Sequence, residues 1–462
     1  MEPKETNSVK IVILGAGVTG LCAALRLTEA QSEPATEILI LEEKPYPGGL
    51  LHTTRREDFW WDDGVFNFQG NNYLYKVLPE LFQPIEGGVL QKVWIQGGIH
   101  DFPLAKRLVL RQPKLALLAI AFDYLYSYLR CSLGCDGTNL QDWLRYRLTS
   151  RLLRLSHLDY YVSKMQGLPL TELSPSLGWQ RLAALSELTR PVRLFYGIFA
   201  SQRKIQEIVR QREPDVYPFK GGVGAVAGKL AELIQRKGVG IAYGARVTGV
   251  RLDQTGVEIE YETAQGPQAY RADYAISTIP LEVLAETIKP AISAAAREAA
   301  QGLSYLDLRL LFLVVKRPMI FDKYFILYSF EPHHLWKRLL SLALPNGLCA
   351  VTVETGFRPR AEALPPDLAS IIIRQLTQEL HLFAPEELVA QYEATVHRAY
   401  PIYQLRFEEK VARIISEVES DRLRLAGRQG RFLYVTTPGA IQSGIDAAER
   451  IIQASKEGGL YT

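Results

Sequence analysis

Residues 9–20 read VKIVILGAGVTG, and this stretch decides the fold. The run 9–14 is apolar and rich in β-branched side chains, which is typical of a buried parallel strand. Three glycines follow within six residues, and an apolar helical stripe begins at Leu21. A second apolar strand, residues 37–41, ends in Glu42. Strand, glycine-rich turn, helix, strand and acidic residue occur in the order of a dinucleotide-binding βαβ unit.

Each glycine of this turn has its own physical role. Gly15 permits the tight turn, Gly17 lets the backbone approach a pyrophosphate, and Gly20 lets the helix pack close to the strand. The N–H groups at the helix start then bind the phosphates, aided by the helix dipole. Glu42 lies about 20 residues beyond the glycines, where its carboxylate accepts hydrogen bonds from a ribose diol and disfavours a 2′-phosphate. The sequence therefore predicts a bound dinucleotide other than NADP.

The composition is that of a globular protein with two or three structural units. Of the 462 residues, 47% are hydrophobic and 22% are charged, so we expect a large core. The net charge of +3 is too small to indicate a nucleic-acid partner. Cys131 and Cys135 have neither a second cysteine pair nor a nearby histidine to complete a zinc site, so we expect no metal. Residues 1–8 lack the apolar core of a signal peptide, which favours a cytoplasmic location.

The longest apolar stretch runs from Leu115 to Leu129, with Asp123 inside it. It is too short and too interrupted to span a bilayer. Packing in the core is the interpretation that we favour. The alternative is an amphipathic surface on which an apolar substrate or a membrane rests, which would make the protein membrane-associated.

A long helical pattern interrupts the alternation of strands and helices. It extends from Lys106 to about Ser186, and Thr138 or Asn139 is placed to cap one of its helices. We interpret this block as an inserted substrate region. Near the end of the chain a strand and a glycine-rich turn precede a helix expected at Ile445–Ile452, whose N-terminus is available to an electron-rich group.

The segment Pro45–Leu50 reads PYPGGL and follows soon after Glu42. A pair of glycines here lets the backbone pass close to a second part of a long cofactor, although an ordinary turn is the alternative for Gly48 and Gly49 alone. Together with the first fingerprint, the segment resembles the FAD fingerprint of the amine oxidase, protoporphyrinogen oxidase and phytoene desaturase superfamily.

Several separated blocks extend this resemblance over nearly the whole chain. Tyr217–Gly224 and Ala272–Pro280 resemble blocks of the protoporphyrinogen oxidase-like flavoproteins. Other blocks look more like the branch that includes UDP-galactopyranose mutases. They are Phe102–Leu104, Asp142–Trp143, Tyr161–Gly167, Tyr400–Tyr403 and Gly427–Tyr434.

The resemblance implies an α/β fold with a Rossmann-type, glutathione reductase-like FAD-binding domain that is discontinuous in sequence. We expect this domain to comprise residues 1–95, 215–285 and 405–462. An α+β substrate domain with a helical insertion is then expected from residues 96–214 and 286–404.

The resemblance also implies which residues bind FAD. They are Gly15, Gly17, Val18, Thr19, Gly20, Glu42, Glu43, Gly48, Gly49, Leu50, Val247, Thr278, Ile441 and Gln442. Val247 is expected to carry the adenine against its backbone, and Ile441 and Gln442 to face the flavin ring. No cysteine or histidine lies in residues 427–452, so we expect the FAD to be non-covalent, with a covalent link through His52 as the alternative.

Two departures from the family pattern bear on the chemistry. Gly64-Val65-Phe66 stands where the family often has Gly-Gly-His, and the mutases use that histidine beside the flavin. Thr436-Thr437-Pro438 stands where many members have Gly-Asp, so a contact to the cofactor is missing or is replaced by Thr437.

The leading hypothesis is therefore an FAD-dependent oxidoreductase that takes a hydride from an apolar or ring-shaped small molecule. Aromatic residues at 60, 61, 66 and 68 are expected to wall the substrate. No general base is evident: Lys164, Tyr403 and Arg428 are weak catalytic candidates, and Asp62 and Asp63 are others.

Two other functional classes stay open. One is a sugar-nucleotide mutase or another non-redox flavoenzyme, in which Arg181, Arg406 and Arg428 hold a diphosphate. The other is a flavoprotein that has lost catalysis. The sequence does not indicate the electron acceptor or the oligomeric state.

Overall fold

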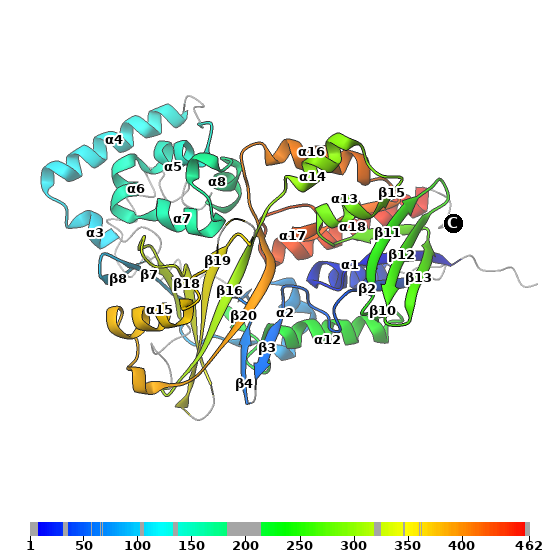
Figure 1. The fold of residues 1–462 in the computed structure, drawn as a ribbon, viewed down its shortest axis with the longest axis horizontal. Coiled ribbons are helices and arrows are strands. Elements are labelled where there is room, and N and C mark those ends of the chain that lie inside the picture. The colour runs from blue at the N-terminus through cyan, green and yellow to red at the C-terminus, as the bar shows by residue number, and fades with distance from the viewer. Residues whose placement is uncertain are drawn as a thin grey trace, which may run out of the picture.

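A five-stranded parallel sheet carries the glycine-rich turn (Figure 1). Its strand order is β10 (Gly240–Tyr243), β2 (Thr36–Glu42), β1 (Val9–Leu14), β14 (Tyr274–Ser277) and β21 (Leu423–Leu425). Helix α1 (Val18–Glu29) follows β1 and packs against both α12 (Gly222–Arg236) and α18 (Thr437–Glu457). Strands from the beginning, middle and end of the chain therefore form one sheet. The computed structural model describes residues 8–30, 36–56, 58–64, 66, 68–101, 106–132, 137–182, 214–317, 325–344, 347–359, 361 and 363–457.

A four-stranded sheet lies beside the parallel sheet and belongs to the same part of the molecule. Its order is β13 (Gly266–Ala272), β12 (Val257–Thr263), β11 (Arg246–Leu252) and β15 (Ile288–Lys289). Helices α13 (Leu281–Thr287), α14 (Ala294–Gln301) and α16 (Phe407–Val418) pack against one another near it.

A seven-stranded sheet forms the second part of the molecule (Figure 1). Its order is β20 (Leu388–Pro401), β16 (Tyr305–Val315), β19 (Cys349–Phe357), β18 (Arg338–Ala343), β17 (Phe325–Ser329), β7 (Leu90–Ile95) and β8 (Gly98–Asp101). All neighbours are antiparallel except β17 and β7. Helix α15 (Leu368–Arg374) continues into a π-helical turn, η4 (Gln375–Glu379), and its apolar residues share a buried cluster with this sheet.

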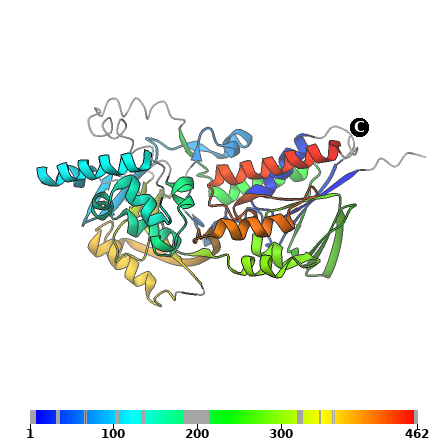
Figure 2. The same ribbon diagram turned by 90° about the horizontal axis from the view of Figure 1, so that it is seen from above.

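The helical block stands at the end of the molecule away from the parallel sheet, as Figures 1 and 2 show. It consists of α3 (Lys106–Leu110), α4 (Lys114–Ser132), α5 (Leu140–Leu148), α6 (Ser150–Ser156), α7 (Leu158–Gln166) and α8 (Ser176–Arg181). Asn139 caps α5, because its side chain accepts a hydrogen bond from the Asp142 N–H at 3.0 Å. The inserted helices predicted from the sequence are thus present.

Smaller elements join the two parts. The hairpin of β3 (Thr53–Arg56) and β4 (Phe59–Asp62) is antiparallel. Strand β9 (Asp215–Tyr217) pairs with both β5 (Phe68–Gln69) and β6 (Gln83–Pro84), and the short helix α2 (Tyr73–Val77) lies between these in sequence.

Three expectations about element placement are wrong. Strand β7 was assigned to the cofactor part but pairs with β17, more than 200 residues away, and β15 was assigned to the substrate part but pairs with β11. Helix α18 begins at Thr437 rather than Ile445. Local sequence patterns do not reveal which distant strands pair with each other. Several strands of similar composition could pair with the same edge of a sheet. The division into two domains otherwise stays a prediction, and Phe102–Leu104 lies outside the described residues.

Candidate cofactor site and active site

The turn between β1 and α1 packs closely against the rest of the protein at Gly15 and Gly20, whereas the space beside Gly17 is open. Gly15 has φ +102°, and its N–H donates to the Leu41 carbonyl at 2.8 Å. A Cβ on Gly20 would overlap the Gly15 carbonyl oxygen, so the helix approaches the strand as closely as glycine allows. A Cβ on Gly17 would meet only Gly49 Cα, at 4.0 Å. The open space above Gly17 is where a pyrophosphate approaches in folds of this kind.

The second glycine pair lies across the first turn. The Gly48 N–H donates to the Ala16 carbonyl at 2.8 Å, and Gly17 and Gly48 form an isolated parallel bridge. Gly49 has φ +64°, and a Cβ on it would lie 3.1 Å from Gly17 Cα. We call Gly15–Gly20 with Gly48–Gly49 the glycine cradle.

The start of α1 leaves donors for an anion. Gly17 is the N-cap residue of α1 and brings no side-chain acceptor to the first turn. The N–H groups at Val18, Thr19 and Gly20 belong to the first turn, which has no intrahelical acceptors for them. Glycine backbone on the open side of the turn, and a helix N-terminus whose first N–H groups have no intrahelical acceptor, fit the diphosphate of FAD.

Glu42 is buried at the rim of the cradle. Its Oε2 accepts from the Ala16 N–H at 2.7 Å, and its Oε1 accepts from the Lys44 N–H at 2.9 Å. Burial raises the pKa of this carboxyl, and the two backbone hydrogen bonds oppose the rise. Each carboxylate oxygen keeps a second lone pair for a ribose hydroxyl. Its neighbour Glu43 is exposed.

Glu42 and the predicted adenine position are close in the fold. The Glu42 carbonyl accepts from the Ala245 N–H at 2.8 Å, and Val247 follows two residues later at the start of β11. The pairing of β11 with β12 shifts between Val247 and Gly249, so the backbone is irregular at this point. The structure thus brings Val247 to the same edge of the sheet as the Glu42 carboxylate, which is predicted to bind the ribose.

Two predicted threonines connect elements of the cradle. Thr278 Oγ1 donates to the Leu14 carbonyl at 2.8 Å and lies 2.5 Å from where a Cβ on Gly15 would be. Thr19 Oγ1 donates to the Ala440 carbonyl of α18 at 3.1 Å. Both hydroxyls therefore hold the backbone around the turn.

The predicted flavin-facing residues lie one turn into α18. Ile441 is buried, whereas Gln442 is exposed and donates to Asp446 at 2.8 Å. Leu50 is partly buried beside the glycine cradle. Their contact with the flavin stays a prediction.

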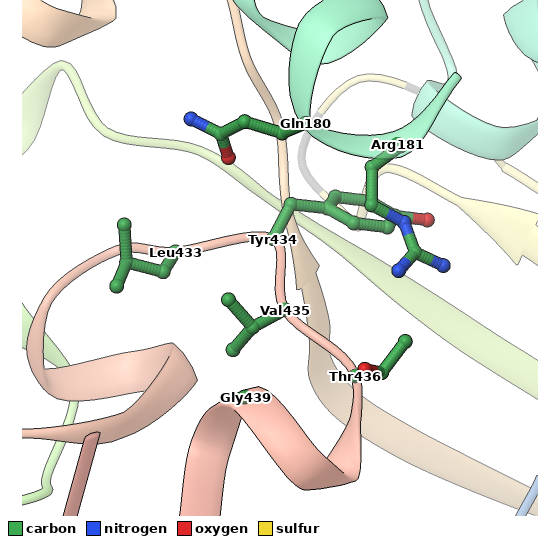
Figure 3. Close-up of a pocket in the computed structure, with 7 residues that line it drawn as sticks. All are labelled: Gln180, Arg181, Leu433, Tyr434, Val435, Thr436 and Gly439. Carbon is green, nitrogen blue, oxygen red and sulfur yellow. The ribbon is translucent and has the colours of Figure 1, made fainter. Parts of the chain in front are cut away.

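A cavity of about 370 Å³ lies between α8 and the chain that connects α17 (Gly427–Gly430) to α18 (Figure 3). Its lining residues are Gln180, Arg181, Leu433, Tyr434, Val435, Thr436 and Gly439. The Arg181 guanidinium lies over the Tyr434 ring, 5.0 Å from its centroid. Because Thr436 directly precedes α18 and Gly439 lies in its first turn, the cavity is at the helix end that the sequence assigns to the flavin ring.

Three cationic side chains lie behind the Tyr434 wall of this cavity. Tyr434 stacks on Tyr400 with 5.1 Å between ring centroids. Arg338 donates to the Tyr400 hydroxyl at 3.0 Å, and Lys337 and Arg428 lie 4.4 and 5.0 Å from the Tyr400 ring centroid. Burial by itself would raise the pKa of Tyr400, but Arg338 and Lys337 outweigh it, and the pKa is lowered.

Glu354 supplies a negative charge next to the cations Arg338 and Lys337. Arg338 donates to both of its oxygens, at 2.6 and 3.0 Å, and Lys337 Nζ lies 3.4 Å away. Lys337 is buried, and Arg338 and Arg428 are partly buried, so three cations meet one buried carboxylate. The region behind the cavity is therefore electropositive.

Tyr403 and Arg428 hold the cavity walls. The Tyr403 hydroxyl donates to Gln180 Oε1 and accepts from the Tyr434 N–H, both at 2.8 Å. Arg428 donates to the carbonyls of Val435 at 2.6 Å and Ala399 at 2.9 Å. These two weak catalytic candidates thus act on the shape of the cavity and do not line it.

Lys164 and Asp62 have structural partners away from the cavity. Lys164 Nζ donates to the Ser329 and Glu331 carbonyls at 2.9 and 3.0 Å, and burial lowers its pKa to about 7. Asp62 is buried and accepts from Thr53 Oγ1 at 2.7 Å, the Val223 N–H at 2.9 Å and the Tyr217 hydroxyl. Burial raises the pKa of Asp62 to about 6. Lys164 therefore fixes the loop after β17, and Asp62 joins β4 to the start of α12.

Two further candidates have side-chain partners outside the cavity lining. Asp63 pairs with His52 at 2.6 Å. Arg406, a candidate diphosphate ligand, is exposed and pairs with Glu409 at 2.7 Å. Of the three arginines named for a diphosphate, Arg181 lines the cavity.

The expected aromatic wall is wrong for two of its four members. Trp61 is buried against the seven-stranded sheet, where its ring stacks on Phe312 at 5.2 Å, and Phe68 belongs to the main core. Strand β4 needs apolar side chains to pack against β19, which accounts for Trp61. Trp60 and Phe66 are partly buried.

Sequence reasoning missed Gln180, Val435 and Gly439 as cavity residues. The signal nearest to them was the unusual run Thr436–Pro438 before the last helix. Nothing local indicated that α8, about 250 residues earlier, forms the opposite wall.

One cluster in the described ranges could coordinate a metal ion, although no metal was expected. His333 and His334 each place Nε2 near Glu379 Oε1, at 3.1 and 3.0 Å. Hydrogen bonds to the shared carboxylate oxygen account for both contacts without an ion. The cluster lies outside the cavity lining.

Comparisons with known proteins agree with this geometry. The model of the family "Flavin containing amine oxidoreductase" matches residues 18–452. Chloroplastic protoporphyrinogen oxidase from Oryza sativa subsp. japonica is 24% identical over 323 residues, which is 64% of this chain and 57% of that protein. The chain thus spans somewhat more than half the length of this curated relative.

Solved structures show the same fold. Reduced UDP-galactopyranose mutase has a TM-score of 0.78 at 19% identity and covers 97% of this chain and 95% of its own. A putative protoporphyrinogen oxidase from Exiguobacterium has a TM-score of 0.71 at 17% identity, with 96% and 99% covered. Given the family match over most of the chain and a cradle that fits the cofactor, the chain belongs to the flavin-containing amine oxidoreductase family, and its cofactor is FAD.

Proposed function

We propose that the protein is an FAD-dependent oxidoreductase whose small-molecule substrate binds in the cavity between α8 and the start of α18. The observation that carries this proposal is the position of the cavity, at the helix end assigned to the flavin ring. When bound, FAD supplies the acceptor for a hydride from a substrate carbon. The glycine cradle and Glu42 would hold the diphosphate and ribose, and the FAD would be non-covalent.

The cavity lining supports a substrate with an apolar body and one acidic group. Leu433 and Val435 and the Tyr434 ring offer apolar surface, and Arg181 is the charged group of the lining. A guanidinium binds a carboxylate or phosphate in bidentate fashion. Tyr403 and Arg428 would orient the substrate indirectly, because they fix the walls that contact it.

The test is an anaerobic titration of the purified holoenzyme with candidate donors. We expect an apolar cyclic or polyene acid to bleach the flavin absorbance, and Arg181→Met to raise the donor concentration needed by at least about tenfold, the effect of losing about 1.4 kcal/mol. Arg406→Met is the matched control, since Arg406 is exposed and paired with Glu409. A flavin that no donor reduces would favour a protein without catalysis.

A mutase-like isomerase is the second candidate, favoured by the three cations behind the cavity, Lys337, Arg338 and Arg428, whose positive charge suits a diphosphate. Phe66 weighs against it, because the resemblance places a histidine there in the mutases. We expect UDP-hexoses neither to bind at micromolar levels nor to turn over with dithionite-reduced enzyme. Turnover with the flavin remaining reduced would reverse the order of the two proposals.

A further inference from the structure

Helix α4 lies at the outer edge of the molecule (Figure 2), and it exposes a row of apolar side chains. Its large apolar side chains Leu115, Leu118, Phe122, Leu125, Tyr126 and Leu129 are each 55–82% exposed. At 100° per residue they fall within one stripe about 100° wide. Packing in the core, the interpretation favoured from the sequence, is therefore wrong for this face of the helix.

The opposite face of α4 is the one that packs on the protein. Ser127 on that side is buried, and α4 contacts α5 and α6. Asp123 pairs with Arg151 of α6 at 2.6 Å. The helix is thus held firmly to the block while its other side presents apolar surface. A helix that is apolar on both sides, with one side in water, indicates a binding surface.

Charge around α4 identifies the kind of partner. Residues 106–182 contain eleven lysines and arginines and five acidic residues, so this segment carries +6, whereas the whole chain carries +3. Arg111 and Lys114 are exposed at the N-terminal end of α4. Beneath the helix, a cavity of about 310 Å³ is lined by Arg151 and Arg154 together with two glutamines and three apolar side chains. Apolar surface with flanking cations matches a bilayer containing anionic lipids.

We propose that α4 docks the protein onto the surface of a membrane that contains anionic lipids. The helix lies in the interface with its stripe inserted between the acyl chains and with Arg111 and Lys114 among the headgroups. In the described ranges no helix is both long and apolar enough to cross a bilayer, which agrees with a helix lying on the surface. A second copy of the chain fits less well, because two segments of charge +6 would face each other. This inference does not depend on the proposed substrate.

The experiment is co-sedimentation of the full-length holoenzyme with vesicles of phosphatidylcholine, with and without phosphatidylglycerol. We expect binding to the anionic vesicles and its weakening by salt. Leu118→Ser combined with Phe122→Ser should lower vesicle binding at least about tenfold, since both side chains lose their apolar transfer energy. Val389→Ser is the matched control, because Val389 is 52% exposed on β20.

A second pair of substitutions tests the charge separately. Arg111→Gln with Lys114→Gln should reduce binding to anionic vesicles while leaving the flavin absorbance and melting temperature unchanged. Wild-type protein that stays in the supernatant with both vesicle types would overturn the proposal, as would equal binding by the serine variant. Loss of a dimer in that variant, measured by light scattering without any vesicle binding, would instead assign the face to a second copy.

Discussion

Glu42 has a structural role and a predicted role in FAD binding, and a single substitution can distinguish them. It accepts the Ala16 and Lys44 N–H groups, and it is proposed to accept the ribose diol. Glu42→Gln keeps one oxygen and loses the charge. We expect FAD binding to weaken by about 1–3 kcal/mol, or roughly 5- to 150-fold in Kd. Isothermal titration of the apoprotein measures this. Glu80→Gln, at an exposed glutamate outside the predicted binding set, is the control and should leave Kd unchanged.

Comparing the free energy of unfolding of the apoprotein and of the holoprotein distinguishes the structural role of Glu42 from its predicted role in FAD binding. The variant should destabilise the holoprotein more than the apoprotein. Equal losses in both forms would make Glu42 purely structural and would contradict the ribose assignment.

Asp62 predicts a specific pH dependence. Burial raises its pKa from an ordinary 3.8 to about 6, so the folded state binds this proton more tightly than the unfolded state. The stabilisation from Asp62 is therefore largest at low pH, falls as pH rises through the window from 3.8 to about 6, and is constant above it. We expect the melting-temperature difference between wild type and Asp62→Asn to change across this window and to be flat above it.

Asp63→Asn serves as the comparison, because Asp63 is adjacent in sequence and pairs with His52. A wild-type minus Asp62→Asn difference that is level between pH 4 and 6 would show that Asp62 is ionised throughout.

Among the elements, the pair α1 and α18 determines whether the cradle keeps its shape. A Cβ on Gly444 of α18 would overlap the Thr19 carbonyl of α1. Gly444→Ala should separate the two helices, lower the melting temperature and weaken FAD binding. Gly228→Ala in α12 is the matched control, since nothing lies within 4 Å of its Cβ position and the change should stabilise that helix by up to about 1 kcal/mol. Thermal melts with and without FAD test both.

One result would contradict the close packing of α18 against α1. If Gly444→Ala and Gly228→Ala shift the melting temperature alike, α18 does not press on α1 and the close approach at Thr19 is wrong.

The cradle was predictable from sequence and the cavity was not. Gly15, Gly17 and Glu42 lie within 28 residues, and each has a local physical reason, so their pattern indicates both fold and ligand. The cavity joins α8 to Tyr434 across about 250 residues, and β7 joins β17 across a similar separation. The many aromatic residues near Trp61 led to a wrong prediction of a substrate-binding wall. Aromatic side chains are typical both of a core and of a substrate pocket, so composition alone does not distinguish the two.

For the whole molecule, FAD is expected to act as a stabilising ligand. The predicted binding residues come from residues 15–50, 247–278 and 441–442, which belong to several elements. A ligand that binds only the folded state stabilises it by about 2.7 kcal/mol at 100 times its Kd. We expect the melting temperature of the apoprotein to rise with added FAD and to be insensitive to NADP. A melting temperature that ignores FAD would contradict the shared site.

The order of the parallel sheet also bears on when the flavin site can be completed during synthesis. Strand β14 occupies the position between β1 and β21, and α18 packs on α1 from the far end of the chain. During synthesis β1, α1 and β2 leave the ribosome long before β21 and α18, which come about 380 residues later in the chain. We therefore expect the nascent chain to carry part of the dinucleotide fold, with the β14 edge of the sheet unpaired, until α18 has been made, and to bind its flavin only after that point.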